Sequence, residues 1–313
     1  MITKNLTEAV TQLKQGQLVA IPTETVYGLA ANALDGKAVS KIFALKERPV
    51  DHPLIVHVSG IEQAKSLVTS FPEKAQKLAK AFWPGPLTLV LPKNDRVPDL
   101  TTGGMESVAI RVPNHPAPLA IIEQCGFPLA APSANPFGRI SPTTALHVEQ
   151  SFGSEAPLIF DGGSCQVGVE STIVSFLDET PCVLRLGGLT IEEIVKLIGP
   201  IAQVGKTAKS IAPGMLPQHY APRTRLLILE EKDPLPAGKL GLLTFNHASN
   251  KEVFQAYEIL SPEGNLEEAA SGFYSALRRL DEASLDAIIA YRFPDKGLGK
   301  ALNDRLERAS HLN

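Results

Sequence analysis

Short apolar segments alternate with helical patterns through the first 200 residues, and this alternation limits the fold classes open to the chain. Strands are predicted at 17–22, 54–58, 87–92, 108–112, 128–132, 157–161, 171–176 and 182–186. Helical periodicity is clearest at 5–15, 37–47, 61–81 and 143–150. Strands separated by helices favour an α/β fold. Because a loop rather than a helix is expected between 87–92 and 108–112, we predict a mixed sheet rather than a purely parallel one.

A stretch rich in proline and glycine, residues 200–224, interrupts this alternation. The composition is typical of a linker, and a structureless segment of this length is either a passive tether or a functional element. Apolar segments at 226–229, 240–245 and 287–291 then predict strands, and helices are expected over 266–280 and from about 298. The 313 residues are therefore expected to form a larger domain (1–200), a linker (201–224) and a small α/β domain (225–313).

Charge and composition exclude several classes of protein. A net charge of −3 argues against a generally basic nucleic-acid coat protein, although it leaves room for a local basic pocket. The N-terminus lacks an apolar signal core, and no apolar segment approaches the roughly 20 residues that span a bilayer. We therefore expect a cytoplasmic protein. The three cysteines form no C-x-x-C pair and the seven histidines are scattered, so no metal site is predicted.

The common phosphate-binding and hydrolytic motifs are missing from the sequence. It contains no G-x-x-x-x-G-K-[ST] and no G-x-G-x-x-G between a strand and a helix. It also contains no G-x-S-x-G elbow and no H-E-x-x-H. If the protein binds a phosphate group, residues outside these motifs must form the phosphate-binding site.

Two polar segments next to predicted secondary structure are candidates for that site. Thr23-Glu24-Thr25 follows the strand at 17–22, and ligands of open α/β sheets bind at strand ends, although an ordinary β-turn would use the same residue types. Lys46 and Arg48 close the helix at 37–47 just before Pro49. Both cations can reach one polyanion if the chain leaves helical geometry there, although cations in a last turn also simply complement the helix dipole.

Further candidates lie on or after other strands. Ser133 and Asn135 belong to the proline-flanked loop Ala131-Pro132-Ser133-Ala134-Asn135-Pro136. Arg111 ends the strand at 108–112, where its guanidinium suits a carboxylate or phosphate as well as a surface ion pair. Ser171 and Arg185 have the same two interpretations. Taken together, these cations and hydroxyls predict a site for a phosphorylated ligand and a small carboxylate.

The motifs resemble those of one known family. They are P-T-E-T-V-Y-G-L at 22–29, K-E-R-P at 46–49, H-P-L-I-V-H-V at 52–58, W-P-G-P-L-T at 83–88, A-I-R-V-P at 109–113, P-S-A-N-P at 132–136 and S-T-I-V at 171–174. The chain resembles the YrdC-like threonylcarbamoyl-AMP (L-threonylcarbamoyladenylate) synthases. The segment A-P-G-M-L-P-Q-H-Y-A-P at 212–222 is similar to the linker of their two-domain members.

The resemblance implies a fold and an activity. The fold would be a YrdC-like twisted mixed sheet flanked by helices, followed by a smaller Rossmann-like α/β domain. The family are nucleotidyltransferases that make threonylcarbamoyl-AMP and pyrophosphate from L-threonine, bicarbonate and ATP, usually with Mg²⁺. A separate threonylcarbamoyl transferase complex then modifies tRNA next to the anticodon, so weak tRNA binding is also expected.

The resemblance also implies roles for particular residues. Those expected to bind L-threonine are Thr25, His57, Arg111, Ala131 (through its backbone) and Ser171. Those expected to bind ATP are Lys46, Arg48, His52, Ser107, Ser133, Asn135, Ser141, Arg185 and Tyr220. Lys46 and Arg48 would be the catalytic pair, and the linker would act as a lid that carries Tyr220. The family often has Asn where this chain has His52, and Tyr-Arg where Pro217-Gln218 precede His219-Tyr220.

Two other functions remain open at this point. A concave basic pocket could bind an RNA backbone without turning over nucleotide, although the net charge and the 18 aromatic residues argue weakly against it. A related domain also serves carbamoyl transfer in hydrogenase maturation, in proteins that carry cysteine-rich zinc motifs. This chain has no such motif.

Overall fold

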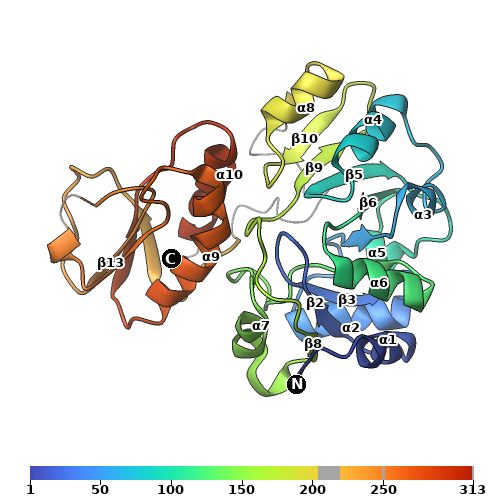
Figure 1. The fold of residues 1–313 in the computed structure, drawn as a ribbon, viewed down its shortest axis with the longest axis horizontal. Coiled ribbons are helices and arrows are strands. Elements are labelled where there is room, and N and C mark those ends of the chain that lie inside the picture. Colours follow the sequence, from blue (N-terminus) through green and yellow to red (C-terminus); the bar gives the residue numbers. More distant parts are fainter. Residues whose placement is uncertain (204–218, 249–250, 312–313) are drawn as a thin grey trace.

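The computed structural model describes residues 1–203, 219–248 and 251–311, and these residues build two sheets with helices packed against them (Figure 1). The larger sheet comes from residues 1–203 and the smaller one from residues after 224. No helix within the described residues is long and apolar enough to span a membrane.

The larger sheet is mixed, as the sequence predicts. Its strands are β1 (Ile2–Thr3), β2 (Val19–Ile21), β3 (Gly28–Asn32), β4 (Ile55–His57), β5 (Leu87–Pro92), β6 (Ser107–Arg111), β7 (Leu129–Ala130), β8 (Leu158–Phe160), β9 (Thr172–Ser175), β10 (Cys182–Arg185) and β11 (Ala202–Gln203). Among the described residues they run in the order β1-β8-β2-β3-β7-β4-β6-β5-β9-β10-β11. β4 and β6 are parallel, whereas β5 and β6 are antiparallel.

The helices of this domain connect and cover the strands. They are α1 (Leu6–Lys14), α2 (Gly36–Lys46), α3 (Ile61–Lys65), α4 (Glu73–Phe82), α5 (Asp99–Thr102), α6 (Pro116–Cys125), α7 (Ala145–Phe152) and α8 (Ile191–Ile198), with a 3₁₀ turn at Gly153–Glu155. α2 shows how the sequence sets their bounds. The Asp35 side chain accepts a hydrogen bond from Lys37 N at its start, and Glu47 stops it in a left-handed conformation at φ 51°.

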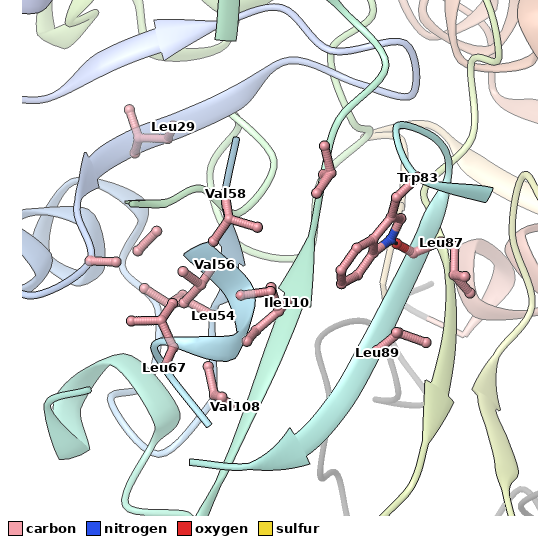
Figure 2. Packing of buried hydrophobic residues seen from close by; sticks show 14 of the residues in the cluster. Leu29, Leu54, Val56, Val58, Leu67, Trp83, Leu87, Leu89, Val108 and Ile110 are labelled. Atoms are coloured by element: carbon pink, nitrogen blue, oxygen red, sulfur yellow. Dashed lines mark hydrogen bonds between the residues drawn. The ribbon is translucent and has the colours of Figure 1, made fainter. Parts of the chain in front are cut away.

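Strand alternation gives the central strands two different faces. Val56, Val58 and Ile110 point into the main hydrophobic core (Figure 2). Their neighbours Ile55 and Ala109 point to the opposite face, where they pack in a separate small cluster. The same alternation directs the next residues on that face, His57 and Arg111, away from the core and toward the site described below.

The smaller domain is a parallel sheet. It contains β12 (Arg225–Ile228), β13 (Leu240–Thr244), β14 (Ala256–Ile259), β15 (Ala287–Ala290), α9 (Leu266–Asp281), α10 (Leu298–Ser310) and a 3₁₀ turn at Lys251–Val253. The described strands run in the order β12-β15-β13-β14, all parallel, with the crossovers typical of a Rossmann-like domain. Figure 1 shows α9 and α10 between this sheet and the larger domain.

The two domains share one hydrophobic cluster. Val26, Ile140 and Val169 of the larger domain belong to the same cluster as Phe273 and Leu302 of α9 and α10. At Gly168 the backbones approach so closely that an added Cβ would lie 2.4 Å from Ala270 O. The smaller domain is therefore packed directly on the larger one rather than connected only by the linker.

Some predicted elements are wrong in detail. The helix expected at 61–81 is two helices, α3 and α4, because Pro72 interrupts the pattern and becomes the N-cap of α4. The connection between β5 and β6 contains the short helix α5. The strands β1, β3, β11 and β14 and the helices α6 and α8 were not predicted.

The expected linker lies partly outside the described residues. Residues 204–218, which include Pro217 and Gln218, are not among them. Of the remaining linker residues, Ala202–Gln203 form β11 beside β10, and His219 and Tyr220 are buried at the candidate site.

Candidate functional site

One pocket gathers most of the residues that the sequence singles out. Its enclosed cavity is about 50 Å³, and the empty space around it, including open solvent at the mouth, is about 540 Å³. It is lined by Thr23, Thr25, Val26, Gly28, Arg48, Ile55, His57, Arg111, Ala131, Pro132, Ser133, Glu170, Ser171, Arg185, His219 and Tyr220. Most of these residues come from strand ends and the loops next to them, Arg48 follows α2, and His219 and Tyr220 come from the end of the linker segment.

The Thr23–Val26 turn positions Thr25. Thr23 Oγ1 accepts hydrogen bonds from Thr25 N at 3.1 Å and Val26 N at 3.2 Å, and it donates to Val26 O at 2.7 Å. These are the hydrogen bonds of an ordinary β-turn, which was one of the two interpretations of the Thr23-Glu24-Thr25 segment. It nevertheless sets Thr25 Oγ1 2.9 Å from Arg111 Nη1, which donates to it. The turn therefore also serves the pocket.

Arg111 is an almost fully buried cation held by three groups. It is 3% exposed. Besides Thr25, it donates from Nε to Gly85 O at 3.2 Å, and its Nη2 forms an ion pair with Glu24 Oε1 at 2.7 Å. These contacts fix the plane of the guanidinium, so that the arginine can present a preformed edge to a carboxylate in the pocket.

His57 lies beside Arg111 on the neighbouring strand. β4 and β6 pair in parallel with His57 opposite Arg111. Burial and the adjacent Arg111 charge lower the pKa of His57 to about 3, so its imidazole is neutral at pH 7. Within the described residues, His57 Nδ1 has no hydrogen-bond partner. A neutral imidazole beside a guanidinium suits the ammonium and carboxylate groups of a small zwitterion.

The side chain of Lys46 contacts the 132–136 loop, whereas that of Arg48 lines the pocket. Lys46 is 1% exposed and donates from Nζ to Ser133 O at 2.6 Å and to Asn135 O. Burial and, to a smaller extent, the Arg48 charge hold its pKa well below the usual value. It ties the 132–136 loop to α2 and is not among the residues that line the pocket.

Arg48 does line the pocket, because the left-handed Glu47 turns the chain out of the helix between the two cations. Its Nη2 donates to Pro53 O at 3.0 Å, and its guanidinium lies 5.6 Å from the centre of the Phe137 ring. Burial lowers its pKa to about 10, so it remains charged at pH 7.

Arg185 and Ser171 form another part of the pocket lining. Arg185 Nη2 donates to Ser171 O at 2.8 Å and to Ser171 Oγ at 3.2 Å. The Ser171 hydroxyl also shares a hydrogen bond of 2.7 Å with Thr88 Oγ1. With Arg48 and Arg111, Arg185 gives the pocket three buried guanidinium groups. Such a wall suits an anionic ligand.

Two aromatic residues from the end of the linker line the pocket. The rings of His219 and Tyr220 have centroids 4.0 Å apart, and His219 N donates to Arg308 O at 3.3 Å. Tyr220 is in the left-handed region at φ 65°, and its hydroxyl has no hydrogen-bond partner within the described residues. Because Tyr220 lines the pocket, this hydroxyl is a candidate for contact with a ligand.

Several predicted residues do not line the pocket. His52 packs its ring 5.4 Å from that of Phe137, and Asn135 donates to Pro136 O and Arg139 O. Ser107 begins β6, four residues before Arg111, which is about 13 Å along the strand. Ser141 is buried and donates to Glu170 Oε1 at 2.6 Å. Their expected contacts with ATP therefore need either a rearrangement or a role through their neighbours.

Sequence reasoning missed a buried carboxylate in the pocket wall and its partners. Glu170 accepts hydrogen bonds from Tyr274 OH at 2.9 Å and from Arg305 Nε at 2.8 Å, both in the smaller domain. One signal was available. Leu302, Arg305, Leu306 and Ala309 follow helical spacing, so a charged residue stands on the apolar face of that helix.

The pocket offers no metal site of its own. Across residues 1–203, 219–248 and 251–311, no group of three or more His, Cys, Asp or Glu side chains could hold a metal ion. Glu170, the carboxylate in the lining, already accepts hydrogen bonds from Ser141, Tyr274 and Arg305. Mg²⁺ usually binds through one or two carboxylates plus substrate phosphates, so these residues do not fit a resident Mg²⁺.

Comparison with known proteins gives the chain a family. A sequence model described as "Telomere recombination" (Sua5/YciO/YrdC) matches residues 11–187, and one described as "Threonylcarbamoyl-AMP synthase, C-terminal domain" matches residues 189–311. Threonylcarbamoyl-AMP synthase of Pyrococcus abyssi is 44% identical over 311 residues, which cover 95% of this chain and 92% of the relative. The protein of that name from Bacillus subtilis is 43% identical over 320 residues, which cover 97% and 92%.

The fold is shared as well. The crystal structure of P. abyssi Sua5 complexed with L-threonine has a TM-score of 0.90 and 41% identity, covering 97% of this chain and 94% of that one. The resemblance seen in the motifs is thereby confirmed. The chain belongs to the Sua5/YciO/YrdC family, among the two-domain members that carry the C-terminal domain of threonylcarbamoyl-AMP synthases.

Proposed function

We propose that this chain is a threonylcarbamoyl-AMP synthase that converts L-threonine, bicarbonate and ATP to threonylcarbamoyl-AMP and pyrophosphate. The observation that carries the proposal is the pairing of His57 with Arg111 in a pocket that also contains Arg48 and Arg185. Arg111 suits an amino-acid carboxylate, and Arg48 and Arg185 suit the phosphates of a nucleotide. The names of the relatives and their sequence identity to this chain support the same reaction.

The reaction needs two bonds to form. The neutral amine of threonine attacks the carbon of bicarbonate, giving a carbamate and water; the proton lost from the threonine ammonium goes to solvent. A carbamate oxygen then attacks the α-phosphorus of ATP. The bond from that phosphorus to the bridging oxygen breaks, and pyrophosphate leaves. The second step is a nucleotidyl transfer.

The residues of the pocket fit a mechanism based on positioning. Arg111 would bind the threonine carboxylate, with Thr25, His57, Ser171 and the backbone of Ala131 around the rest of the amino acid. Holding a short-lived carbamate in line with ATP can contribute roughly 7–11 kcal/mol. Because the pKa of His57 is about 3, this ring is a weak base and more suited to hydrogen bonding than to proton abstraction.

The nucleotide would bind on the side of Arg48, Ser133 and Arg185. Arg48 would neutralise charge on the triphosphate and on departing pyrophosphate. Lys46 would act through the loop it holds, because its Nζ donates to Ser133 O and Asn135 O. Tyr220 would close the nucleotide side from the linker. Mg²⁺ would enter with ATP, bound by phosphate oxygens rather than by a protein cage.

The proposed product would be the substrate of another enzyme. Threonylcarbamoyl-AMP is a mixed anhydride, so it would pass to a transferase complex that moves the threonylcarbamoyl group to tRNA. Weak tRNA binding by this chain, at sites outside the pocket, would serve that transfer.

The test is pyrophosphate release by the purified full chain with ATP and Mg²⁺, omitting L-threonine or bicarbonate in turn. Release that requires both substrates is the expected result. Release without either would indicate a generic ATPase activity, and no release at all with RNA binding that falls steeply with salt would indicate an RNA-binding module instead. Both outcomes contradict the proposal.

A further inference from the structure

A fully buried arginine of the smaller domain reaches the wall of the pocket. Arg305 of α10 is 0% exposed, and its Nε donates to Glu170 Oε2 at 2.8 Å. Its Nη2 donates to Leu186 O at 2.8 Å, also in the larger domain. Its Nη1 donates to Asp304 Oδ2 at 2.6 Å within α10. One side chain therefore joins the two domains at the pocket.

Glu170 accepts hydrogen bonds from three side chains, those of Ser141, Tyr274 and Arg305. Oε1 accepts from Ser141 Oγ at 2.6 Å, and both oxygens lie 2.9 Å from Tyr274 OH. Although burial raises the pKa of this carboxyl group, Arg305, Arg185 and Ser141 together hold it at about 2. Glu170 is therefore an anion that lines the pocket, and the largest single compensating charge is that of Arg305 in the smaller domain.

The same guanidinium supports Tyr220. Arg305 Cζ lies 4.9 Å from the centre of the Tyr220 ring, and the Tyr220 and Tyr274 rings have centroids 5.9 Å apart. The ring of Tyr220 is thus placed between the pocket and α10. Loss of Arg305 would remove the larger of the two counter-charges of Glu170, leaving only Arg185, and would also remove the support of Tyr220.

We propose that Arg305 is a positioning residue for nucleotide binding, which compensates Glu170 and seats Tyr220 so that the pocket accepts a triphosphate when the smaller domain is docked. This inference rests on the proposed function, because it takes the ligand to be ATP. The physical reason is that an uncompensated buried carboxylate repels a polyanion at short range with little screening. The smaller domain thereby contributes to the site without touching the reacting atoms.

The inference predicts a pH signature that a purely structural arginine would not give. Without Arg305, the remaining groups that act on Glu170 are Arg185 of β10, Ser141, His219, Tyr220 and Tyr274 of α9, and Asp304 of α10 loses the same partner. Only Arg185 among them is a cation at neutral pH, so the pKa of Glu170 rises. Protonation at lower pH would then remove the repelling charge, and ATP would bind more tightly.

The experiment measures ATP affinity by calorimetry in the full chain, separately from turnover. Arg305→Met should weaken ATP binding about tenfold or more near pH 8. It should leave L-threonine binding within about twofold, because Arg111 is untouched. The loss should shrink toward pH 6 in Arg305→Met by more than any change in the unmodified chain.

A charge-balanced double variant separates this effect from misfolding. Glu170→Gln combined with Arg305→Met removes both charges, and it should restore ATP affinity to within about threefold of the unmodified chain. Arg279→Met is the matched control, since it removes an exposed arginine that is paired with Glu258 on the same domain. It should not change ATP affinity.

Three results would overturn the inference. They are unchanged ATP affinity in Arg305→Met, an equal loss in the double variant, and a loss that does not depend on pH. If the unmodified chain binds ATP but releases no pyrophosphate with threonine and bicarbonate, the proposed function fails while these binding measurements still decide the role of Arg305.

Discussion

His57 and Arg111 lie side by side at the ends of two parallel strands, with their backbones paired in register. The pairing places a neutral imidazole next to a guanidinium that also bonds Thr25 and Glu24. Neither residue needs a special loop, because strand alternation alone turns both away from the core that contains Val56 and Ile110. The positions of His57 and Arg111 are therefore set by the sheet rather than by a loop.

Arg111→Lys should raise the KM for L-threonine about tenfold or more while changing the KM for ATP by about twofold or less. Lysine keeps a buried positive charge for Glu24 but lacks the planar guanidinium that binds a carboxylate with two parallel hydrogen bonds. Steady-state kinetics with each substrate varied in turn checks this. An equal rise in both KM values would argue against Arg111 as the carboxylate site.

Acid should destabilise the protein partly through His57. Its folded-state pKa of about 3 lies below the unfolded value of about 6.5, so the unfolded state binds the extra proton. The stability that depends on a neutral His57 is complete above pH 6.5 and is lost progressively toward pH 3. At pH 5 the loss amounts to about 2 kcal/mol.

Denaturant unfolding of His57→Gln at a series of pH values measures this contribution. The variant should have a shallower loss of stability between about pH 6.5 and pH 4 than the unmodified chain. Burial lowers the pKa of His147 to about 4. His147 therefore contributes the same pH dependence of stability to both proteins. Identical slopes in the two proteins would show that His57 is not buried in its neutral form.

Lys46→Ala and Arg48→Ala should each lower turnover about tenfold or more, for different reasons. Arg48 lines the pocket, whereas Lys46 holds the loop of Ser133 and Asn135. Lys46→Ala leaves buried carbonyl groups without their donor, which should also cost about 1–3 kcal/mol of stability. Turnover and thermal unfolding measured together distinguish the two roles. Kinetics like those of the unmodified chain in both variants would mean that the triphosphate lies elsewhere.

Gly168→Ala should loosen the contact between the domains. At φ +74° any Cβ is strained, and here it would also lie 2.4 Å from Ala270 O of α9. Hydrogen exchange over α9 and α10 should become faster. Gly126→Ala is the matched control, because Gly126 has a similar φ of +78° but nothing within 4 Å of the added Cβ. Equal exchange over α9 and α10 in both variants would contradict close docking at Gly168.

Much of the fold could be predicted because its signals are local. The mixed sheet, α1, α2 and the α/β character of the smaller domain follow from apolar periodicity, and the fold class is confirmed. β3 was missed because Gly-Leu-Ala-Ala-Asn contains no β-branched residue, and only its pairing with β2 and β7 makes it a strand. α8 could have been found from its capping box, Thr190 and Glu193.

Part of the candidate site could likewise be predicted from local sequence, and part of it could not. Thr25, Arg111, Ser133 and Ser171 stand at strand ends or in adjacent loops, where sequence alone points to them. The contact between Glu170 and Arg305 joins residues 135 positions apart and exists only because two domains dock. No pattern in either segment specifies the other, so this part of the pocket needed the structure.

Incorporation of carbon-13 from labelled bicarbonate is the most direct test of the central claim, that one pocket joins threonine, bicarbonate and the adenylyl group of ATP. Mass spectrometry of the reaction should detect threonylcarbamoyl-AMP whose mass rises by one unit with labelled bicarbonate, and Arg111→Lys should form it about tenfold or more slowly at low L-threonine. Pyrophosphate release without a labelled adenylate, or an adenylate that forms equally fast in the Arg111 variant, would contradict the account.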